Sequence, residues 1–429
     1  MRTDQYKHIL LKEPHLVGLW LSQILSATGD QLYSIAIVWI AVKTGGAQAG
    51  FVSGAGAISG LLLGLIGGVY ADRWNKRNAM IAIDILRALT VLFLGVIGHF
   101  MPLNMVLLGI ASVIVSGLGS MFDPALAASL PELTDNDEKR LQAMNAMMQV
   151  NHRLARTIGP GLAGWLVAAT ALHHFFTLDA VSFLVSALAI FAIRGKYRWK
   201  SELPVQKTGF RGILQDISRG ATLVYRHEQL LWAFGLYVGA NIAWCAGFML
   251  GFPLWAKQLP DANAGTYGLM VAAYGVGSVS SNFVMGTITS RKRMFFISIS
   301  QLIFALGFFV VALSTTLPMA CFGAFLAAIG GPTGDVMLMV MLQTDIPRQD
   351  LGKVFSLRMC VMYLGGALGL LLAPMLYQVC SPKEGIAISA LTFLALGIVG
   401  LMKFGMAESP YKPFRESEDT QSVAPVVHS

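Results

Sequence analysis

The stretch GGVYADRWNKRN, residues 67–78, places Asp72, Arg73, Lys76 and Arg77 in a short connection between two long apolar runs. This concentration of charge is unusual in a chain of 429 residues in which 55% are hydrophobic and 13% are charged. A soluble globular protein carries about 25% charged residues. We therefore interpret the chain as a membrane protein that crosses the bilayer many times, with residues 67–78 as a loop between two crossings.

The apolar runs on either side of this loop have the length of a membrane crossing, which is roughly 20 residues for a helix. At this length the whole chain is predicted to be an all-α membrane protein with twelve transmembrane helices. They are expected at residues 16–42, 48–70, 78–100, 103–130, 141–169, 173–193, 229–256, 264–289, 293–314, 317–344, 354–379 and 385–406. Several are rich in glycine, as in GAGAISGLLLGLIGG, and small residues predict helices that pack closely against one another.

Lysine and arginine are distributed unevenly over the connections between the predicted helices. Twenty-four of the 31 lie in connections on one side, and three, Lys43, Lys257 and Lys383, lie on the other. Because positive residues favour the cytoplasmic side, this bias predicts a multi-pass protein of the cell (inner) membrane with both termini in the cytoplasm. It also explains the net charge of +8 without a nucleic-acid partner. The four cysteines show no paired spacing, so we expect no disulfide, metal site or cofactor.

The longest polar interruption, residues 194–228, divides the chain into two six-helix halves, 1–193 and 229–406. Residues 407–429 form a polar tail that we expect to be disordered. Within the linker, FRGILQDISRGATLVYR predicts an amphipathic helix whose basic residues face the inner leaflet, although an ordinary solvated helix fits equally well. Repeated six-helix halves are typical of transporters that bind their substrate between the halves.

The loop at residues 67–78 resembles the motif Gly-x-x-x-Asp-Arg-x-x-Arg/Lys-Arg/Lys of the major facilitator superfamily. The matching residues are Gly68, Asp72, Arg73, Lys76 and Arg77. The stretches SATGDQL, DPALAASLPEL and RTIGPGLAGWL further resemble the branch that holds macrolide and multidrug exporters and enterobactin-type siderophore exporters. The resemblance covers the whole chain and implies the major facilitator fold, with transport by alternating access.

The resemblance also implies that these loop residues latch the cytoplasmic side shut when the cavity faces outward. Asp123, at the end of the fourth predicted helix, is the expected acceptor for Arg73, and Asp72 would lie near a helix N-terminus, where the helix dipole favours an anion. The alternative is a basic loop that only sets orientation. In the second half, GTITSRKR keeps the glycine and the basic residues but lacks the acid, so we expect a weaker latch there or one made by other residues.

The fifth predicted helix contains RTIGPGLAG, which resembles the antiporter motif Gly-Pro-x-x-Gly-Gly at Gly159, Pro160 and Gly164. The motif implies export rather than uptake, although a generic proline kink is an alternative. The fourth predicted helix lacks the arginine that many proton-driven relatives carry, which argues against the usual proton route.

Asp30 is an ionisable residue in the middle of the first predicted helix. Such a residue within the membrane is a functional candidate, because burial favours the neutral acid and lets it carry a proton. We identify Asp30 as the proton-coupling candidate. The alternative is a structural salt bridge with Arg153 or Arg156, which are expected at a similar depth. Asp84 and Arg87, three residues apart, are expected to pair with each other.

Polar and aromatic residues on two helices are candidates for the substrate cavity. They are Asn145, Gln149, Arg153 and Arg156 on the fifth predicted helix and Trp232, Tyr237, Asn241 and Trp244 on the seventh. A polar stripe as deep as that on the fifth helix faces protein or water rather than lipid. Its two arginines could bind an anionic ligand such as a siderophore, or could pair with Asp30, Asp123 or Asp179. Ordinary packing remains the alternative for the aromatic residues.

These observations predict a secondary active transporter that exports drugs or other small hydrophobic or amphipathic molecules in exchange for protons, as a monomer in the lipid bilayer. The sequence has no phosphate-binding loop, so we expect an ion gradient to supply the energy. The alternatives are siderophore export or uptake, then lysophospholipid transport or metal export. The motifs Gly-x-Ser-x-Gly and His-Glu-x-x-His are absent from the sequence, so we expect no enzyme activity and no catalytic residue.

Overall fold

The computed structural model describes residues 9–70, 75–135, 137–193, 210–260, 262–288, 290–347 and 350–405. Within these residues all regular secondary structure is helical. The first group of helices is α2 (Pro14–Gly45), η1 (Gly46–Gln48), α3 (Ala49–Tyr70), α4 (Lys76–Phe100), α5 (Met105–Leu133), α6 (Glu138–Ala169) and α7 (His173–Ala192). The linker helix is α8 (Phe210–Tyr225). The second group is α9 (Glu228–Trp244), η2 (Cys245–Gly251), α10 (Phe252–Ala256), α11 (Ala264–Thr287), α12 (Arg293–Leu313), α13 (Leu317–Asp345), α14 (Leu351–Val379) and α15 (Pro382–Phe404).

Ten helical stretches of the described residues are long and apolar enough to cross a membrane. The first of these, Pro14–Gly64, contains α2 and most of α3, which the short helix η1 separates. Helix α6 is not among the ten, but its 32 residues exceed the length that a crossing needs. Each of the twelve predicted segments therefore overlaps a long helical stretch, and the seventh is built from α9, η2 and α10 in succession.

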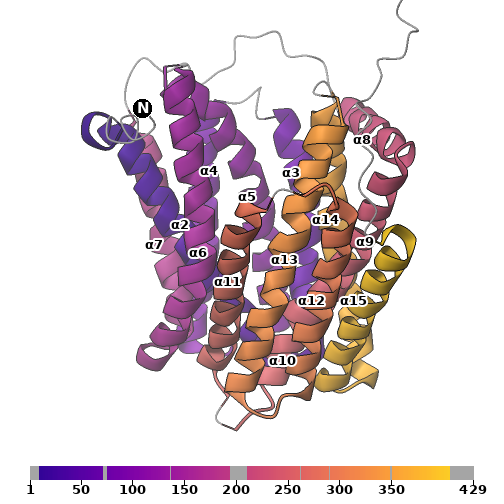
Figure 1. The fold of residues 1–429 in the computed structure, drawn as a ribbon. Coiled ribbons are helices and arrows are strands. Elements are labelled where there is room, and N and C mark those ends of the chain that lie inside the picture. Colours follow the sequence, from indigo (N-terminus) through magenta and orange to yellow (C-terminus); the bar gives the residue numbers. More distant parts are fainter. Residues whose placement is uncertain are drawn as a thin grey trace, which may run out of the picture.

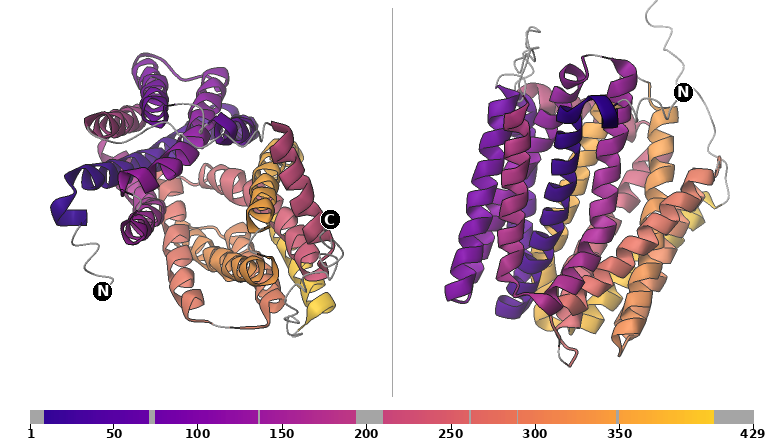
Figure 2. Two further views of the ribbon diagram at one scale, coloured as in Figure 1. Left: turned by 90° about the horizontal axis from the view of Figure 1, so that it is seen from above. Right: turned by 90° about the vertical axis from the view of Figure 1, so that its left-hand side faces the viewer.

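The long helices run side by side, with α8 at one end of the bundle and α10 at the other (Figure 1). We call these the linker end and the far end. Viewed along the bundle, the helices α2–α7 and α9–α15 form two groups (Figure 2), which we call the N-half and the C-half. Between the halves, α6 packs along α11 and α3 packs along α14. The domain limits at residues 193, 228 and 406 stay predictions.

Glycine allows the close contacts of α3 that its sequence predicts. A Cβ atom on Gly50 would lie 2.6 Å from the carbonyl oxygen of Leu370 on α14, across the two halves. A Cβ atom on Gly56 would lie 2.3 Å from Oγ of Ser112 on α5, within the N-half. Any larger residue at either position would push the helices apart. The predicted close packing of this glycine-rich helix is therefore confirmed.

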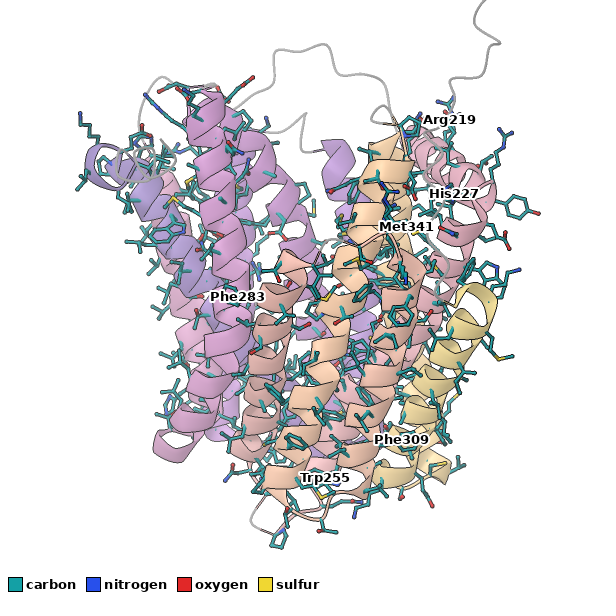
Figure 3. The ribbon with its side chains drawn as sticks, in the orientation of Figure 1. Arg219, His227, Trp255, Phe283, Phe309 and Met341 are labelled. Carbon is teal, nitrogen blue, oxygen red and sulfur yellow. The ribbon has the colours of Figure 1, made fainter. Side chains whose placement is uncertain are left out.

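The buried apolar residues form one core at the far end and two at the linker end. The far-end core is shared by both halves, since it joins Val42 of α2 to Phe248 and Trp255 of the C-half. Trp255 lies at this end and is fully enclosed (Figure 3). At the linker end, Met144 belongs to a core of the N-half, and Met341 belongs to a core made by the C-half and the linker helix α8. The described residues therefore hold the halves together by apolar packing at the far end and not at the linker end.

The seventh membrane segment contains a π-helix, η2, which sequence patterns do not predict. Its altered backbone hydrogen bonding is supported by Tyr377 of α14, whose hydroxyl donates to the carbonyl oxygen of Ala246 at 3.2 Å. Short π-helical insertions occur frequently at functional sites. This one lies between α9 and the far-end helix α10.

Candidate functional site

A charged core lies inside the N-half, where α2, α4 and α7 meet. The Nη2 atom of Arg87 on α4 lies 2.6 Å from Oδ1 of Asp30 on α2. The arginine side chain is 9% exposed and the aspartate side chain 37% exposed. The guanidinium also lies over the ring of Phe183 on α7, 3.9 Å from its centroid. Among the described residues, Arg87 therefore forms its ion pair with Asp30 and not with Asp84, the partner that the sequence had led us to expect.

Two further acids complete this charged core and are more deeply buried. Asp84 on α4 is 1% exposed, and neither of its carboxylate oxygens has a hydrogen-bond partner among the described residues. Asp179 on α7 is completely buried, and its Oδ1 accepts a hydrogen bond of 3.1 Å from Ser182. Gly29 makes room for this arrangement, because a Cβ atom there would lie 2.5 Å from Oδ1 of Asp179. The sequence analysis placed Asp179 only among possible partners for the arginines of α6.

The polar stripe predicted on the fifth membrane segment lies on α6, which packs against α2 and α11. Asn145 is exposed, and its assignment to the substrate cavity stays a prediction. Asn151, which the sequence analysis did not select, is buried and donates to the carbonyl oxygen of Trp20 at 3.2 Å. The remaining predicted residues of α6 have side chains outside the described part of the structure: Gln149, Arg153, Arg156, Gly159, Pro160 and Gly164. Their roles stay predictions.

Two of the four candidates on the seventh segment, Asn241 and Trp244, form hydrogen bonds with other helices of the C-half. The side-chain amide of Asn241 donates to the carbonyl oxygen of Met362 on α14 at 3.2 Å. The indole N–H of Trp244 donates to the hydroxyl of Tyr274 on α11 at 2.9 Å. Trp244 also stacks on Phe248, with 5.0 Å between the ring centroids. This aromatic group is half-buried beside the far-end core.

Trp232 lies apart from these residues, and its assignment to the substrate cavity stays a prediction. Its ring packs edge-on against Phe404 of α15 and lies 5.8 Å from Nζ of Lys403. Lys403 also forms an ion pair with Glu228, the first residue of α9, at 2.9 Å. Trp232 thus belongs to the junction between the start of α9 and the end of α15. Residues on different turns of α9 contact different helices, so the position of Trp232 near the start of α9 determines its neighbours.

A second charged group, which the sequence analysis did not assign, lies inside the C-half. The Nη2 atom of Arg358 on α14 lies 3.3 Å from Oδ1 of Asp335 on α13 and 3.4 Å from the hydroxyl of Tyr237 on α9. The Asp335 side chain is 49% exposed. The sequence feature that could have identified Arg358 and Asp335 is the same as for Asp30, namely a charged residue within an apolar segment.

The loop that resembles the superfamily motif is described only in part, since residues 71–74 lie outside the description. Lys76 donates to the carbonyl oxygen of Ala128 on α5 at 3.2 Å. Arg77 donates to the carbonyl oxygens of Ile190 and Phe191 at the end of α7, at 3.3 and 2.5 Å. Both basic residues therefore tie the start of α4 to the ends of neighbouring helices within the N-half.

The remaining residues of the predicted latch stay predictions. Gly68, Asp72 and Arg73 lie outside the described side chains. Asp123 is close enough to Arg87 and to Tyr363 of α14 to act on both electrostatically. In the C-half, Arg293 at the start of α12 pairs with Asp345 at the end of α13 at 2.7 Å, and both side chains are buried. This pair joins a basic residue of the GTITSRKR loop to an acid of α13, and the expectation of a weaker latch, or one made by other residues, in this half stays a prediction.

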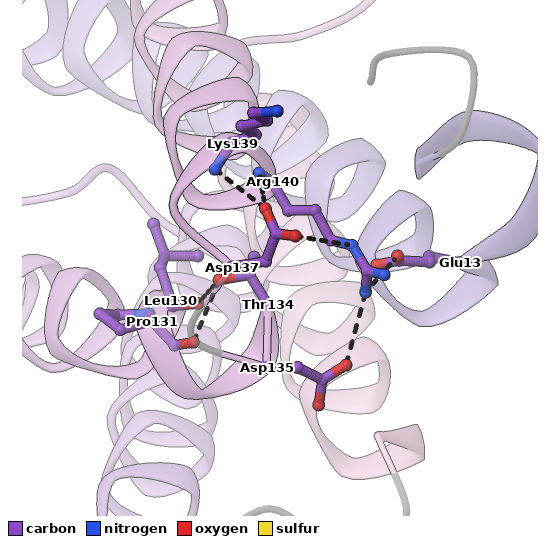
Figure 4. A network of polar contacts seen from close by, with 8 residues as sticks. All are labelled: Glu13, Leu130, Pro131, Thr134, Asp135, Asp137, Lys139 and Arg140. Carbon is purple, nitrogen blue, oxygen red and sulfur yellow. Dashed lines mark hydrogen bonds and ion pairs between the residues drawn. The ribbon is translucent and has the colours of Figure 1, made fainter. Parts of the chain in front are cut away.

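The connection between α5 and α6 is held by a polar network around Arg140 (Figure 4). Nη1 of Arg140 lies 3.0 Å from Oε1 of Glu13, before α2, and 3.5 Å from Oδ2 of Asp135. Asp137 caps α6 by accepting hydrogen bonds from the backbone N–H groups of Lys139 and Arg140. These hydrogen bonds hold the pKa of Asp137 below its ordinary value, and the bond from the backbone of Arg140 has the largest effect. The network fixes the start of α6 relative to α2 at the linker end.

The far end carries a hydrogen-bonded contact between the halves. Nζ of Lys257, which follows α10, donates to the carbonyl oxygens of Val42 and Lys43 at 2.9 and 3.3 Å. These carbonyls belong to the last turn of α2, where the helix dipole favours a cation. The contact joins the C-half to the N-half beside the shared apolar core.

The described residues contain no group of three or more His, Cys, Asp or Glu side chains arranged to hold a metal ion. All four cysteines are free thiols.

Comparison with known proteins gives a consistent result. The transmembrane secretion effector family matches residues 10–423. The uncharacterized MFS-type transporter YfiS of Bacillus subtilis is 24% identical over 424 residues, covering 94% of this chain and 96% of that protein. The multidrug efflux pump Tap of Mycolicibacterium fortuitum is 25% identical over 408 residues, covering 91% and 96%. Among solved structures, a mutant of the nucleoside transporter NupG is similar in fold with a TM-score of 0.70 and 12% identity, covering 91% of this chain and 100% of that one.

Proposed function

The chain belongs to the transmembrane secretion effector family of the major facilitator superfamily, and we propose that it exports drugs or other small amphipathic molecules in exchange for protons. The members of this family are transporters and not enzymes. The similarity to Tap, a multidrug efflux pump, supports the direction of transport and the substrate class. The basic residues of the linker end support a cytoplasmic position for that end and for both termini. The protein then acts as a monomer in the inner membrane.

The observation that carries proton coupling is the ion pair between Asp30 and Arg87. Asp30 is the half-exposed member of a charged core that is otherwise buried, so a proton can reach it. Protonation removes the negative charge of Asp30, so the guanidinium of Arg87 loses its ion-pair partner and can bind another acceptor. A change of charge in the N-half core would thereby be linked to the positions of α2 and α4.

Alternating access follows from the unequal ends of the bundle. The shared core and the Lys257 contact favour a closed far end, whereas the separate cores of the linker end leave the halves free to part there. In the opposite state, the loop residues Asp72 and Arg73, with Asp123, would latch the linker end. We assign the substrate to the half interface, between α6 of the N-half and Tyr237, Asn241 and Trp244 of the C-half.

The experiment is transport into everted membrane vesicles with an acidified interior, using ethidium as a fluorescent amphipathic probe. Wild-type vesicles should accumulate ethidium only while the pH gradient lasts. Asp30→Asn should abolish accumulation while ethidium binding to the purified protein stays measurable. As a control, Asp350→Asn alters an acid that pairs with Lys353 at the linker end and should leave accumulation intact. Accumulation by Asp30→Asn vesicles equal to wild type would contradict the role of Asp30.

A further inference from the structure

The buried Asp84 carboxyl is not explained by the Asp30–Arg87 pair. It is 1% exposed, and both oxygens lack a hydrogen bond of good geometry among the described residues, although the hydroxyl of Ser186 lies close to the carboxyl group. Among the described residues, the charged or titratable groups that act on the charged core are Asp30 and Tyr33 from α2, Arg87 from its own helix, Asp123 from α5 and Asp179 from α7. Within this described part of the N-half, four carboxyl groups therefore share one guanidinium.

An ionised carboxylate that is buried without hydrogen bonds or an ion pair is strongly destabilising. Asp30 already neutralises Arg87 at 2.6 Å, so that arginine does not compensate a second negative charge. Asp179 at least receives the hydroxyl of Ser182 at 3.1 Å. Asp84 is thus the acid of this core whose geometry most requires a bound proton in the observed state.

The position of Asp84 also provides an exchange partner for Arg87. The two residues are three apart on α4, so their side chains lie on the same face of the helix. The Nε atom of Arg87 is buried and has no acceptor among the described residues. A change of side-chain rotamer could therefore turn the guanidinium from Asp30 toward Asp84 without moving the helix.

A polar route connects Asp84 with the less buried part of the N-half. The hydroxyl of Ser186 on α7 faces Asp84 and accepts a hydrogen bond of 2.9 Å from the amide of Gln23 on α2. Gln23 is partly exposed. The Ser186 hydroxyl can accept a proton from Asp84 and pass on its own, whereas the amide nitrogen of Gln23 only donates and carries no proton; the released proton therefore passes from Ser186 to solvent beside the partly exposed Gln23.

We propose that Asp84 is a second proton-binding residue of the transporter, and that Arg87 exchanges Asp30 for Asp84 as its ion-pair partner during each cycle. The inference rests on the proton coupling proposed above. When Asp30 takes up a proton, Arg87 turns to Asp84, and Asp84 releases its proton toward Ser186. Arg87 keeps its positive charge throughout, so one proton enters the core and one leaves it. Asp84 thus links protonation of the accessible acid Asp30 to proton release through Ser186 of α7.

Infrared spectroscopy of the purified protein in lipid tests the bound proton directly. Wild type at neutral pH should show the C=O stretch of a protonated carboxyl, and Asp84→Asn should lack this band. Asp84→Glu should retain a band at a shifted frequency, which keeps the test valid if the asparagine variant folds poorly. Asp350→Asn, outside the charged core, should show the wild-type band. A band that persists unchanged in Asp84→Asn would overturn the proposal.

Ethidium transport separates this inference from the proposed function. Asp84→Asn should reduce accumulation driven by a pH gradient about a hundredfold, as expected when a proton-transferring group is removed. Full accumulation by this variant would overturn the role of Asp84 while leaving proton-coupled export intact. Failure of wild type to respond to the pH gradient would instead contradict the proposed function. In that case the infrared spectra would still show whether Asp84 holds a proton.

Discussion

Replacing Lys257 by glutamine should open the far end of the bundle. Nζ of Lys257 donates to two carbonyl oxygens of the last turn of α2, at 2.9 and 3.3 Å, and these bonds exist only while the halves touch there. A hydrogen bond that involves a charged group is worth about 1.5–3 kcal/mol when it is well shielded. Because Lys257 is exposed, solvent screens the contact, and a cation at a helix C-terminus then contributes about 0.3–1 kcal/mol.

A loss of this size shifts the balance between the two end states by about two- to fivefold, since about 1.4 kcal/mol corresponds to tenfold. Pulsed electron spin resonance can measure the shift from the distance between spin labels at Met101 and Val379. Both residues are exposed at the far end, one in each half, and the four native cysteines would be replaced first. The fraction of long distances should rise in Lys257→Gln.

Lys383 supplies the matched control, because it is another far-end lysine and forms no hydrogen bond or ion pair with the described residues. Lys383→Gln should leave the distance distribution of wild type unchanged. An unchanged distribution in Lys257→Gln, or an equal change in both variants, would refute the reasoning that this hydrogen-bonded contact holds the far end closed.

Two further predictions concern stability. Arg293→Gln leaves the buried Asp345 without its partner and should destabilise the protein by about 3–5 kcal/mol. Lys403→Gln breaks an exposed ion pair and should cost about 1 kcal/mol or less. Thermal unfolding in detergent compares the two variants, and equal losses of stability would argue against the buried geometry of the Arg293–Asp345 pair. Hydrogen bonds from the backbone of Arg140 and its neighbour hold the pKa of Asp137 below 3.8, so the charged carboxylate stabilises the fold above that pH and this contribution is lost as the pH falls through the lower folded-state pKa. Asp137→Asn keeps a capping side chain but does not titrate, so melting temperatures between pH 2 and 5 should depend less on pH than in wild type; identical pH profiles would contradict this assignment.

The amino-acid sequence determined the helical segments and the character of their connections. Long apolar runs leave few other options in a membrane, because a helix satisfies all its backbone hydrogen bonds internally. The described helices accordingly overlap every predicted segment, and the linker contains the predicted helix α8. The loop at residues 67–78 identified the superfamily, because its charged residues have a defined spacing in a short connection.

Only the tertiary structure decided which charged residues meet. The periodicity of one helix defines a face, but it does not show which residue of another helix lies opposite. Asp84 and Arg87 share a face of α4, and yet Arg87 pairs with Asp30, because α2 brings a carboxylate within 2.6 Å. Trp232 and Trp244 belong to the same segment, and yet they meet different helices. The contact of Lys257 with α2 joins residues 214 and 215 positions apart, and no local pattern encodes such a distance. The helices follow from local chemistry, whereas the charged core and the far-end contact arise from how the helices pack.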